Sequence, residues 1–341
     1  MMLYKTIFYF VLFMSSVHVF AQDFQIKTVV EPNSSIRALE VTDGGEVWFA
    51  GSNGTYGVSK NNGQTWEIDS ISFHGFKLNF RGIASSSQGL HLTAIENPGM
   101  VFNTKNGGDS WYLTHFEEGE GVFYDAIHFF DYNEGMILGD PTDDCFSILK
   151  TYDSGDSWRK VSCLKLPKID EKEAAFAASN TNIESQGDSV WIVTGGSQAR
   201  VLFSADRGEN WTVQKTPMIS GKTMTGIYSV DFYDHLNGVI IGGDWENKSY
   251  NQKNKAVTKD GGKTWRLVGR KQAPGYQSCV QYIPNSGGSK LVSVGSTGVY
   301  YSSNYGKTWK MISKKPFYSL KFISPNKAIL SGHKIISVLT L

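Results

Sequence analysis

The octapeptide TKDGGKTW (258–265) has five near-copies elsewhere in the chain: SKNNGQTW (59–66), TKNGGDSW (104–111), TYDSGDSW (151–158), SADRGENW (204–211) and SSNYGKTW (302–309). All six fit the pattern S/T-x-D/N-x-G-x-x-W, and each lies between two short β-like runs. An Asp or Asn side chain accepts hydrogen bonds from backbone N–H groups just ahead of it, and Gly adopts positive φ at little cost. The pattern therefore predicts a hairpin corner that has a structural and not a catalytic role.

Each copy is called a box below. Two positions of a box define the corner. The Asp or Asn accepts the hydrogen bonds, and the Trp starts the return strand and buries its ring beside the turn. The Asp or Asn residues are Asn61, Asn106, Asp153, Asp206, Asp260 and Asn304, and the tryptophans are Trp66, Trp111, Trp158, Trp211, Trp265 and Trp309.

The spacing of the boxes predicts the architecture. Successive box tryptophans are 44 to 54 residues apart, with two further β-like runs between boxes. Four strands per repeat is the blade of a β-propeller. Innermost strands are expected to start near seven residues: Ile36, Phe80, Asp125, Ala175, Ser229, Gln277 and Tyr318.

The seventh repeat ends at Leu341 before a fourth strand can form, but FQIKTVV (24–30) precedes the first blade and is available. Pairing residues 24–30 with 334–340 removes two unpaired sheet edges. The sequence therefore predicts an all-β fold: a seven-bladed β-propeller of four-stranded blades whose ring is closed by the N-terminal strand.

The first 21 residues have the features of a secretory signal peptide: one Lys, an apolar run, and a small residue, Ala21, at a plausible cleavage point. Residues 22–341 are then one domain, because no linker or sustained helical periodicity marks a second. The apolar run is short for a membrane span. The whole chain carries a formal net charge of +1, and its Lys and Arg residues are scattered. The sequence therefore argues against nucleic acid as a partner.

Three cysteines are present, an odd number for an exported chain. Cys145 and Cys163 flank the third box symmetrically, which would place them nearly opposite each other on adjacent strands and within reach of a disulfide. They are the predicted pair, with free thiols as the alternative, and Cys279 is expected to be a buried thiol.

The boxes resemble the Asp-box (BNR) repeat of sialidases, sortilins and some glycoside hydrolases. Longer stretches, among them FYDAIHFFDYNEGMILGDP, TGGSQARVLFSADRGENW and GIYSVDFYDHLNGVIIGGD, are similar to secreted bacterial propellers related to the photosystem II stability/assembly factor. This resemblance spans essentially the whole of residues 22–341. It implies a non-catalytic assembly chaperone, although a shared fold does not transfer function.

Motifs for cofactor-dependent or nucleophilic catalysis are absent from the sequence. There is no GxSxG, GxGxxG, HExxH or CxxC, and the seven His residues have no ligand spacing. DPTDD (140–144) offers three carboxylates of the kind that suit Ca²⁺, but a solvated acidic loop is the preferred interpretation. We expect no cofactor and no metal.

Charged residues gather at one predicted rim. In a four-stranded meander the boxes occupy one rim, so the starts of the first and third strands of each blade occupy the other. Arg37, Arg81, Arg200 and Tyr276 are the candidate ligand-binding residues at this box-free rim. Guanidinium groups recognise carboxylate or phosphate in a planar, bidentate way. The alternative is that these residues form salt bridges between blades.

Three functions remain open at this point. The first is an exported, non-catalytic binding or assembly propeller that recognises a protein partner or an anionic ligand at the box-free face. The second is a glycoside hydrolase acting on extracellular glycans, for which the candidate carboxylates are Asp125, Asp140, Glu173 and Asp244. The sialidase variant is weakened because Arg37 is followed by Ala-Leu and not by Ile-Pro. The third is a purely structural surface protein.

The expected location is periplasmic or extracellular, and the sequence gives no oligomeric state.

Overall fold

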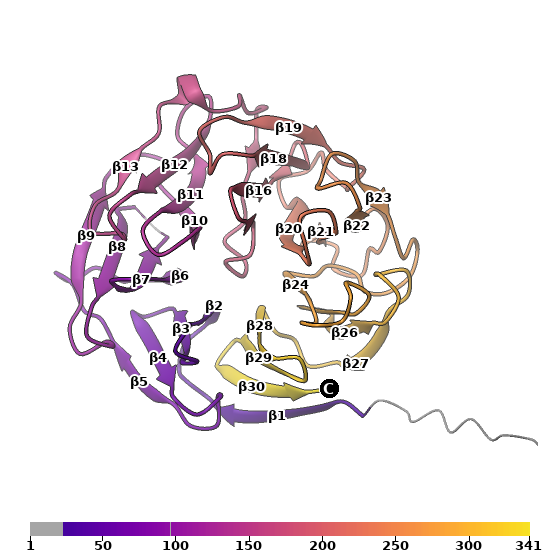
Figure 1. The fold of residues 1–341 in the computed structure, drawn as a ribbon, viewed down its shortest axis with the longest axis horizontal. Helices are drawn as coiled ribbons and strands as arrows, with labels where there is room; N and C mark the ends of the chain where they lie inside the picture. Colours follow the sequence, from indigo (N-terminus) through magenta and orange to yellow (C-terminus); the bar gives the residue numbers. More distant parts are fainter. Residues whose placement is uncertain (1–22, 96) are drawn as a thin grey trace, which may run out of the picture.

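The computed structural model describes residues 23–95 and 97–341. The predicted signal peptide lies outside them. The described residues form seven antiparallel sheets arranged around a central axis, so the predicted seven-bladed propeller is confirmed (Figure 1). Each blade runs from an inner strand beside the axis to an outer strand at the rim, and neighbouring strands in the chain pair directly.

The strand bounds are as follows, from the axis outward. Blade one is β2 (Ile36–Val41), β3 (Val47–Gly51), β4 (Thr55–Ser59) and β5 (Glu67–Ser70). Blade two is β6 (Phe80–Ser86), β7 (Gly89–Ala94), β8 (Gly99–Thr104) and β9 (Tyr112–Glu117). Blade three is β10 (Tyr124–Phe129), β11 (Gly135–Pro141), β12 (Phe146–Thr151) and β13 (Arg159–Lys160), followed by the short 3₁₀ helix η1 (Cys163–Lys165). Blade four is β15 (Ile183–Gln186), β16 (Ser189–Val193), β18 (Arg200–Ser204) and β19 (Thr212–Lys215). Blade five is β20 (Thr225–Phe232), β21 (Gly238–Asp244), β22 (Lys255–Thr258) and β23 (Arg266–Leu267), extended at β20 by the two short strands β17 (Gly195–Gly196) and β14 (Glu173–Ala174). Blade six is β24 (Cys279–Tyr282), β25 (Leu291–Gly295), β26 (Gly298–Ser302) and β27 (Lys310–Ser313).

Blade seven closes the ring. Its strands are β28 (Ser319–Ser324), β29 (Lys327–Gly332), β30 (Ile335–Thr340) and the N-terminal β1 (Gln25–Val30). β1 pairs antiparallel with β30, with Gln25 opposite Thr340 and Val30 opposite Ile336 (Figure 1). The predicted pairing of the two ends of the chain is therefore confirmed.

The boxes form the predicted corners between the third and fourth strands of blades one to six. In the fifth box, Thr258 Oγ1 donates to Asp260 Oδ1, and the same oxygen accepts from the Thr264 amide at 2.9 Å. The Gly262 amide donates to Thr258 Oγ1, also at 2.9 Å. These bonds span no more than four residues, so a box can form the same corner wherever it occurs.

Apolar side chains fill the spaces between neighbouring blades. One cluster joins Trp48 of blade one to Phe80 and Phe102 of blade two, and another joins Phe49 of blade one to Ile329 of blade seven. Burial of both faces of each sheet accounts for the near-continuous apolar runs of the second strands. This packing on both faces holds each blade in place around the axis. It therefore also positions the inner strand of each blade.

The structure also tests the predicted cysteine pairing and the predicted starts of the inner strands. Cys145 and Cys163 are joined by a disulfide with a Cα–Cα distance of 5.6 Å, and Cys279 is a buried free thiol. Blade four differs from expectation, because its inner strand starts at Ile183 and not near Ala175. No helix among the described residues is long and apolar enough to cross a membrane.

Candidate functional site

The eight residues displaced from blade four, 175–182, run through the central channel and are called the channel segment here. They contact each of the six other blades. Arg37 NH1 donates to the Ala178 carbonyl oxygen and Arg81 NH1 to that of Ala177, both at 3.2 Å. The contacts with the remaining four blades are those of the Ala175 amide with Asp140 in blade three (3.0 Å), Thr181 with Ser229 in blade five (2.8 Å), Ser179 with Ser278 in blade six (2.7 Å) and Ser179 with Ser319 in blade seven (3.2 Å).

Asn180 anchors the channel segment in the middle of the channel. Its Oδ1 accepts from the Ile127 amide and its Nδ2 donates to the Ile83 carbonyl oxygen, both at 2.9 Å. Both bonds go to backbone groups of inner strands, which leaves the side chain no freedom to rotate. The channel segment thus closes the channel toward the box-free rim, where the sequence placed a binding cleft.

The predicted ligand-binding residues all lie at this closed end and contact other parts of the chain. The Arg37 guanidinium also covers the Tyr318 ring, 3.9 Å from its centroid. Arg200 Nε donates to Glu173 Oε1 at 2.8 Å in an ion pair whose carboxylate is fully buried. Tyr276 is buried and packs edge-on against Tyr228. The arginines therefore bind the channel segment and a neighbouring carboxylate, as the salt-bridge interpretation expects for Arg200.

The candidate catalytic carboxylates are sealed from solvent or engaged by backbone groups. Asp125 is fully buried, and burial together with the nearby Asp140 charge raises its pKa well above the usual range, against the opposing effect of Arg81. Burial raises the pKa of Asp140 to about 6. Asp244 accepts from two backbone amides and lies 3.9 Å from Lys222. In the structure these carboxylates are therefore buried or occupied by contacts within the chain.

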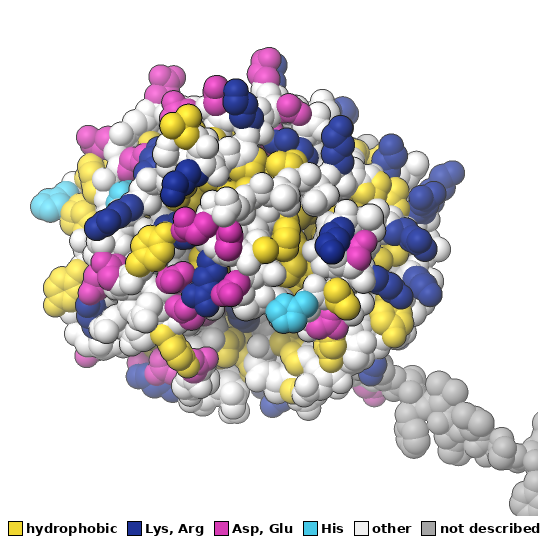
Figure 2. All heavy atoms as spheres, turned by 45° about the horizontal axis from the view of Figure 1, so that its top comes forward, with side chains coloured by type: hydrophobic (Ala, Val, Ile, Leu, Met, Phe, Trp, Pro, Cys, Tyr) yellow, Lys and Arg dark blue, Asp and Glu magenta, His cyan; other side chains and the backbone are white. Residues whose placement is uncertain are grey.

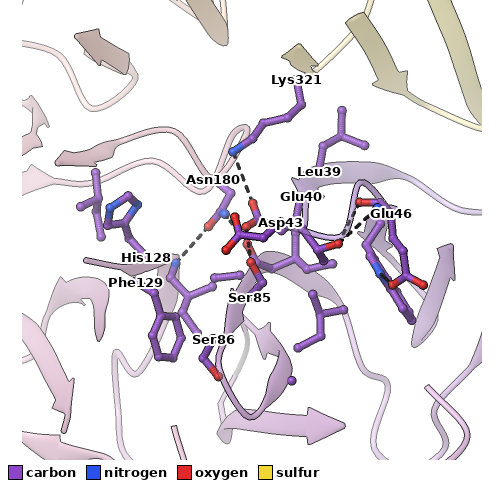
Figure 3. A pocket seen from close by; sticks show the side chains of 18 of the residues that line it. Leu39, Glu40, Asp43, Glu46, Ser85, Ser86, His128, Phe129, Asn180 and Lys321 are labelled. Carbon is purple, nitrogen blue, oxygen red and sulfur yellow. Dashed lines mark hydrogen bonds and ion pairs between the residues drawn. The ribbon is translucent and has the colours of Figure 1, made fainter. Parts of the chain in front are cut away.

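A cavity of about 880 Å³ opens at the opposite, box-bearing rim. We call it the well. Its mouth is formed by the hairpins between the first two strands of blades one to three, and Asn180 and Thr181 of the channel segment lie among its lining residues. Figure 3 shows Glu40, Ser85, His128 and Lys321 converging on it from different inner strands. Its volume lies within the range of about 300–1,000 Å³ that is typical of ligand sites.

Each inner strand contributes at least one polar side chain to the well, and one such residue from each strand makes up the set that we call the polar ring. Its members are Glu40 (β2), Ser85 (β6), His128 (β10), Glu184 (β15), Asp231 (β20), Gln281 (β24) and Lys321 (β28). In all seven strands the polar residue directly follows an apolar one, as in Leu39-Glu40 and Leu320-Lys321. This repeated step is the signal in the sequence that could have located the well.

The polar ring is held by a few internal contacts. Glu40 accepts from Ser85 Oγ at 2.8 Å and from Lys321 Nζ at 3.3 Å (Figure 3). His128 Nε2 lies 2.7 Å from Ser185 Oγ, and burial, with the Lys321 charge, lowers the pKa of His128 to about 4. His128 is therefore neutral at neutral pH, and Lys321 is the cation of the polar ring.

Two carboxylates of the polar ring are strongly perturbed. Burial, followed by the Asp231 charge, raises the pKa of Glu184 to about 8, and burial raises that of Asp231 to about 7. Asp231 Oδ2 accepts from the Tyr282 amide at 2.6 Å. Perturbed carboxylates in a cavity are a common mark of a functional site. Among the described residues, no cluster of three or more His, Cys, Asp or Glu residues suits a metal ion.

Comparisons with known proteins support the fold and leave the chemistry open. No family model and no curated protein matches the chain. Among solved structures, YCF48 bound to D1 peptide has a TM-score of 0.68 and 16% identity, covering 94% of this chain and 97% of that one. YCF48 from Cyanidioschyzon merolae gives 0.66 and 15%, covering 92% and 98%. The WD40 propeller domain of Doa1 gives 0.61 and 12%, covering 93% and 97%. At these identities the likeness shows a shared seven-bladed fold.

Proposed function

We propose that this protein is a binding propeller whose ligand is a segment of a partner polypeptide and whose binding site is the well. The observation that carries the proposal is the well itself: a deep cavity on the axis, lined by polar groups from all seven inner strands. Propellers commonly use the mouth of the central channel for binding. Support also comes from YCF48, a similar fold that has been solved with a peptide bound.

The proposed site differs from the one that the sequence suggested. Arg37, Arg81 and Arg200 all donate to groups of this chain, and the channel segment fills the channel beside the first two. A ligand at the box-free rim would have to displace those contacts. A ligand at the well meets side chains that already face an open cavity, so binding there costs less rearrangement.

The test uses purified protein on an array of short, unbiased peptides, with the tightest binders then measured in solution by fluorescence anisotropy. In the variant Ser85→Arg, a guanidinium next to Glu40 occupies the well from within. We expect it to weaken peptide binding at least about tenfold, or by about 1.4 kcal/mol. Ser70→Arg, at the exposed end of β5, is the matched control and should bind as the wild type does.

The second variant, Gln88→Trp, narrows the mouth from an exposed hairpin and keeps the test valid if Ser85→Arg fails to fold. Peptides that bind both variants as tightly as the wild type would place the site elsewhere. The protein is also incubated with oligosaccharide probes under the conditions of the peptide array. Release of sugar that is lost in the well variants would favour the hydrolase alternative over binding.

We also propose that the protein works outside the cytoplasm, in a periplasm or in the extracellular space. The Cys145–Cys163 disulfide supports this proposal, because such bonds persist mainly in oxidising compartments. Thiol labelling of protein taken directly from cell fractions checks it. In protein unfolded without reductant, one alkylated thiol, that of the buried Cys279, is expected, and three would contradict the proposal.

A further inference from the structure

The charges around the well do not balance. Beside Lys321, the polar ring holds three carboxylates, Glu40, Glu184 and Asp231, and the hairpin of blade one adds Asp43 and Glu46 at the mouth. Two other charged residues of the lining are already neutralised from outside it. Asp131 pairs with Arg207, and Lys105 pairs with Asp156 at 2.7 Å. The well therefore has a formal deficit of positive charge.

Lys321 does not remove this deficit. Its Nζ lies 3.3 Å from Glu40, and the Glu40 charge is the main reason why its pKa is raised. Among the described residues, no Lys, Arg or His nitrogen lies within 4.0 Å of the Glu184 or Asp231 carboxylate. Figure 3 shows Lys321 directed toward Glu40. Two neighbouring blades thus present carboxylates to the cavity without a cation in contact.

The groups that face these two carboxylates explain how the isolated protein tolerates them. Glu184 and Asp231 raise each other's cost of ionisation, Lys321 favours ionisation of both, and neutral His128 contributes no charge. From the neighbouring blade, the Tyr282 amide donates to Asp231, and the buried Tyr282 hydroxyl stays protonated because its pKa is raised. At neutral pH the pair therefore retains protons that a bound cation could replace.

We infer that the well selects a cationic group, a Lys or Arg side chain of the partner segment, and binds it against Glu184 and Asp231; this inference rests on the proposed function. The ammonium or guanidinium group supplies the missing charge and donates hydrogen bonds to both carboxylates. Carboxyl protons leave to solvent as it enters. No covalent bond forms or breaks.

This exchange makes binding depend on pH with a defined sign. A carboxylate whose pKa is raised in the free protein must ionise to hold the cation, so affinity should increase as pH rises through about 7 to 8, and by at most about tenfold per pH unit for each proton released. Binding should also release protons. Calorimetry in buffers of different ionisation enthalpy measures that release directly.

The experiment uses short acetylated and amidated peptides with Gly and Ser flanks and a central Lys, Arg, norleucine or Glu. At about pH 8.5 we expect the Lys and Arg peptides to bind at least about tenfold more tightly than the norleucine and Glu peptides. At about pH 6 the same Lys and Arg peptides should bind less tightly than they do at about pH 8.5. The double variant Glu184→Gln/Asp231→Asn should lose both the preference and the proton release. Glu67→Gln, exposed on β5 and far from the well, should keep both.

The outcomes separate this inference from the proposed function. If norleucine or Glu peptides bind equally well and Ser85→Arg still blocks them, the well binds peptides and the inferred charge preference is wrong. If Lys and Arg peptides bind with no proton release and no effect of the double variant, the cation lies elsewhere and the inference is overturned. If no peptide binds at either pH, the proposed function fails and the inference with it.

Discussion

At the scale of single residues, burial sets the chemistry of the ionisable side chains. His91 on β7 is fully buried, lies on the Phe129 ring and contacts Ser86 Oγ at 2.9 Å. Burial lowers the pKa of His91 to about 4, only partly opposed by the Asp156 charge. The histidine is thus held neutral, and its protonation is coupled to unfolding.

His91 should make the fold sensitive to acid. Its pKa is about 6.5 in the unfolded chain and about 4 in the folded one, so the stability it contributes is complete above pH 6.5 and is lost as pH falls toward 4. The loss amounts to about 3 kcal/mol at most. His91→Gln should flatten the fall in the free energy of unfolding between these pH values, measured by urea denaturation. His333→Gln, at an exposed turn, should leave the slope unchanged, and an equal effect of both variants would contradict this assignment.

At the scale of elements, the boxes and the channel segment behave differently. A box is built from hydrogen bonds within its own residues, as between Thr258 and Asp260. A box also packs closely against the preceding blade, because a Cβ at Gly155 of the third box would lie 2.2 Å from His91 Cε1 of blade two. Gly155 also has a φ of +85°, which residues other than Gly rarely adopt. The channel segment has no regular strand in its middle and is held by six other blades.

Asn180 is the residue on which the channel segment most depends. Asn180→Ala leaves the Ile127 amide and the Ile83 carbonyl oxygen without their side-chain partner in the interior. Since a buried unsatisfied group costs about 1–3 kcal/mol, the variant should lose about 2–4 kcal/mol of unfolding free energy in chemical denaturation. Asn326→Ala, which removes one exposed hydrogen bond to Ser324, is the matched control and should lose less than about 0.5 kcal/mol. Equal losses would mean that the channel segment does not brace the ring.

At the scale of the whole molecule, ring closure joins the two ends of the chain. β1 supplies the outer strand of blade seven, and Phe24 and Ile26 pack against the core of blades six and seven. Around this ring, Figure 2 shows Lys and Arg side chains predominating toward the right of the view, and Asp and Glu side chains mixed with them toward the left and centre. The charge imbalance on which the inferred cation preference rests is a different one, inside the well.

The closure predicts a permuted chain that folds. Because Gln25 lies opposite Thr340, residues 24–31 can be moved behind Leu341 through an Asn-Gly turn, making β30 and β1 a hairpin. Deleting residues 23–31 should lower the melting temperature by several degrees, and the permuted chain should recover most of that loss. A deletion variant as stable as the wild type would show that β1 contributes nothing to closure.

The sequence by itself determined the blade and its repetition. Each box is specified by residues at most seven positions apart, so its hydrogen bonds can be deduced locally, and the spacing of the boxes then gives the number of blades and the missing outer strand. The same local reasoning misplaced the inner strand of blade four, because apolar residues 175–178 look like a strand. Their burial in the channel becomes visible only when six other blades surround them.

The proposed site depends on the tertiary structure. The polar ring takes one residue from each of seven strands, and the largest separation, from Glu40 to Lys321, spans most of the chain. The charge of the well also depends on pairings that no local pattern shows, such as Arg207 neutralising Asp131 and Asp156 neutralising Lys105. Sequence reasoning counted arginines at one rim and expected them to bind a protein partner or an anionic ligand, or to form salt bridges. In the folded chain those arginines donate to groups of the chain itself, and carboxylates face the cavity at the other rim. Local hydrogen bonds fix a hairpin corner, but which charges stay uncompensated depends on how distant residues pair in the folded chain.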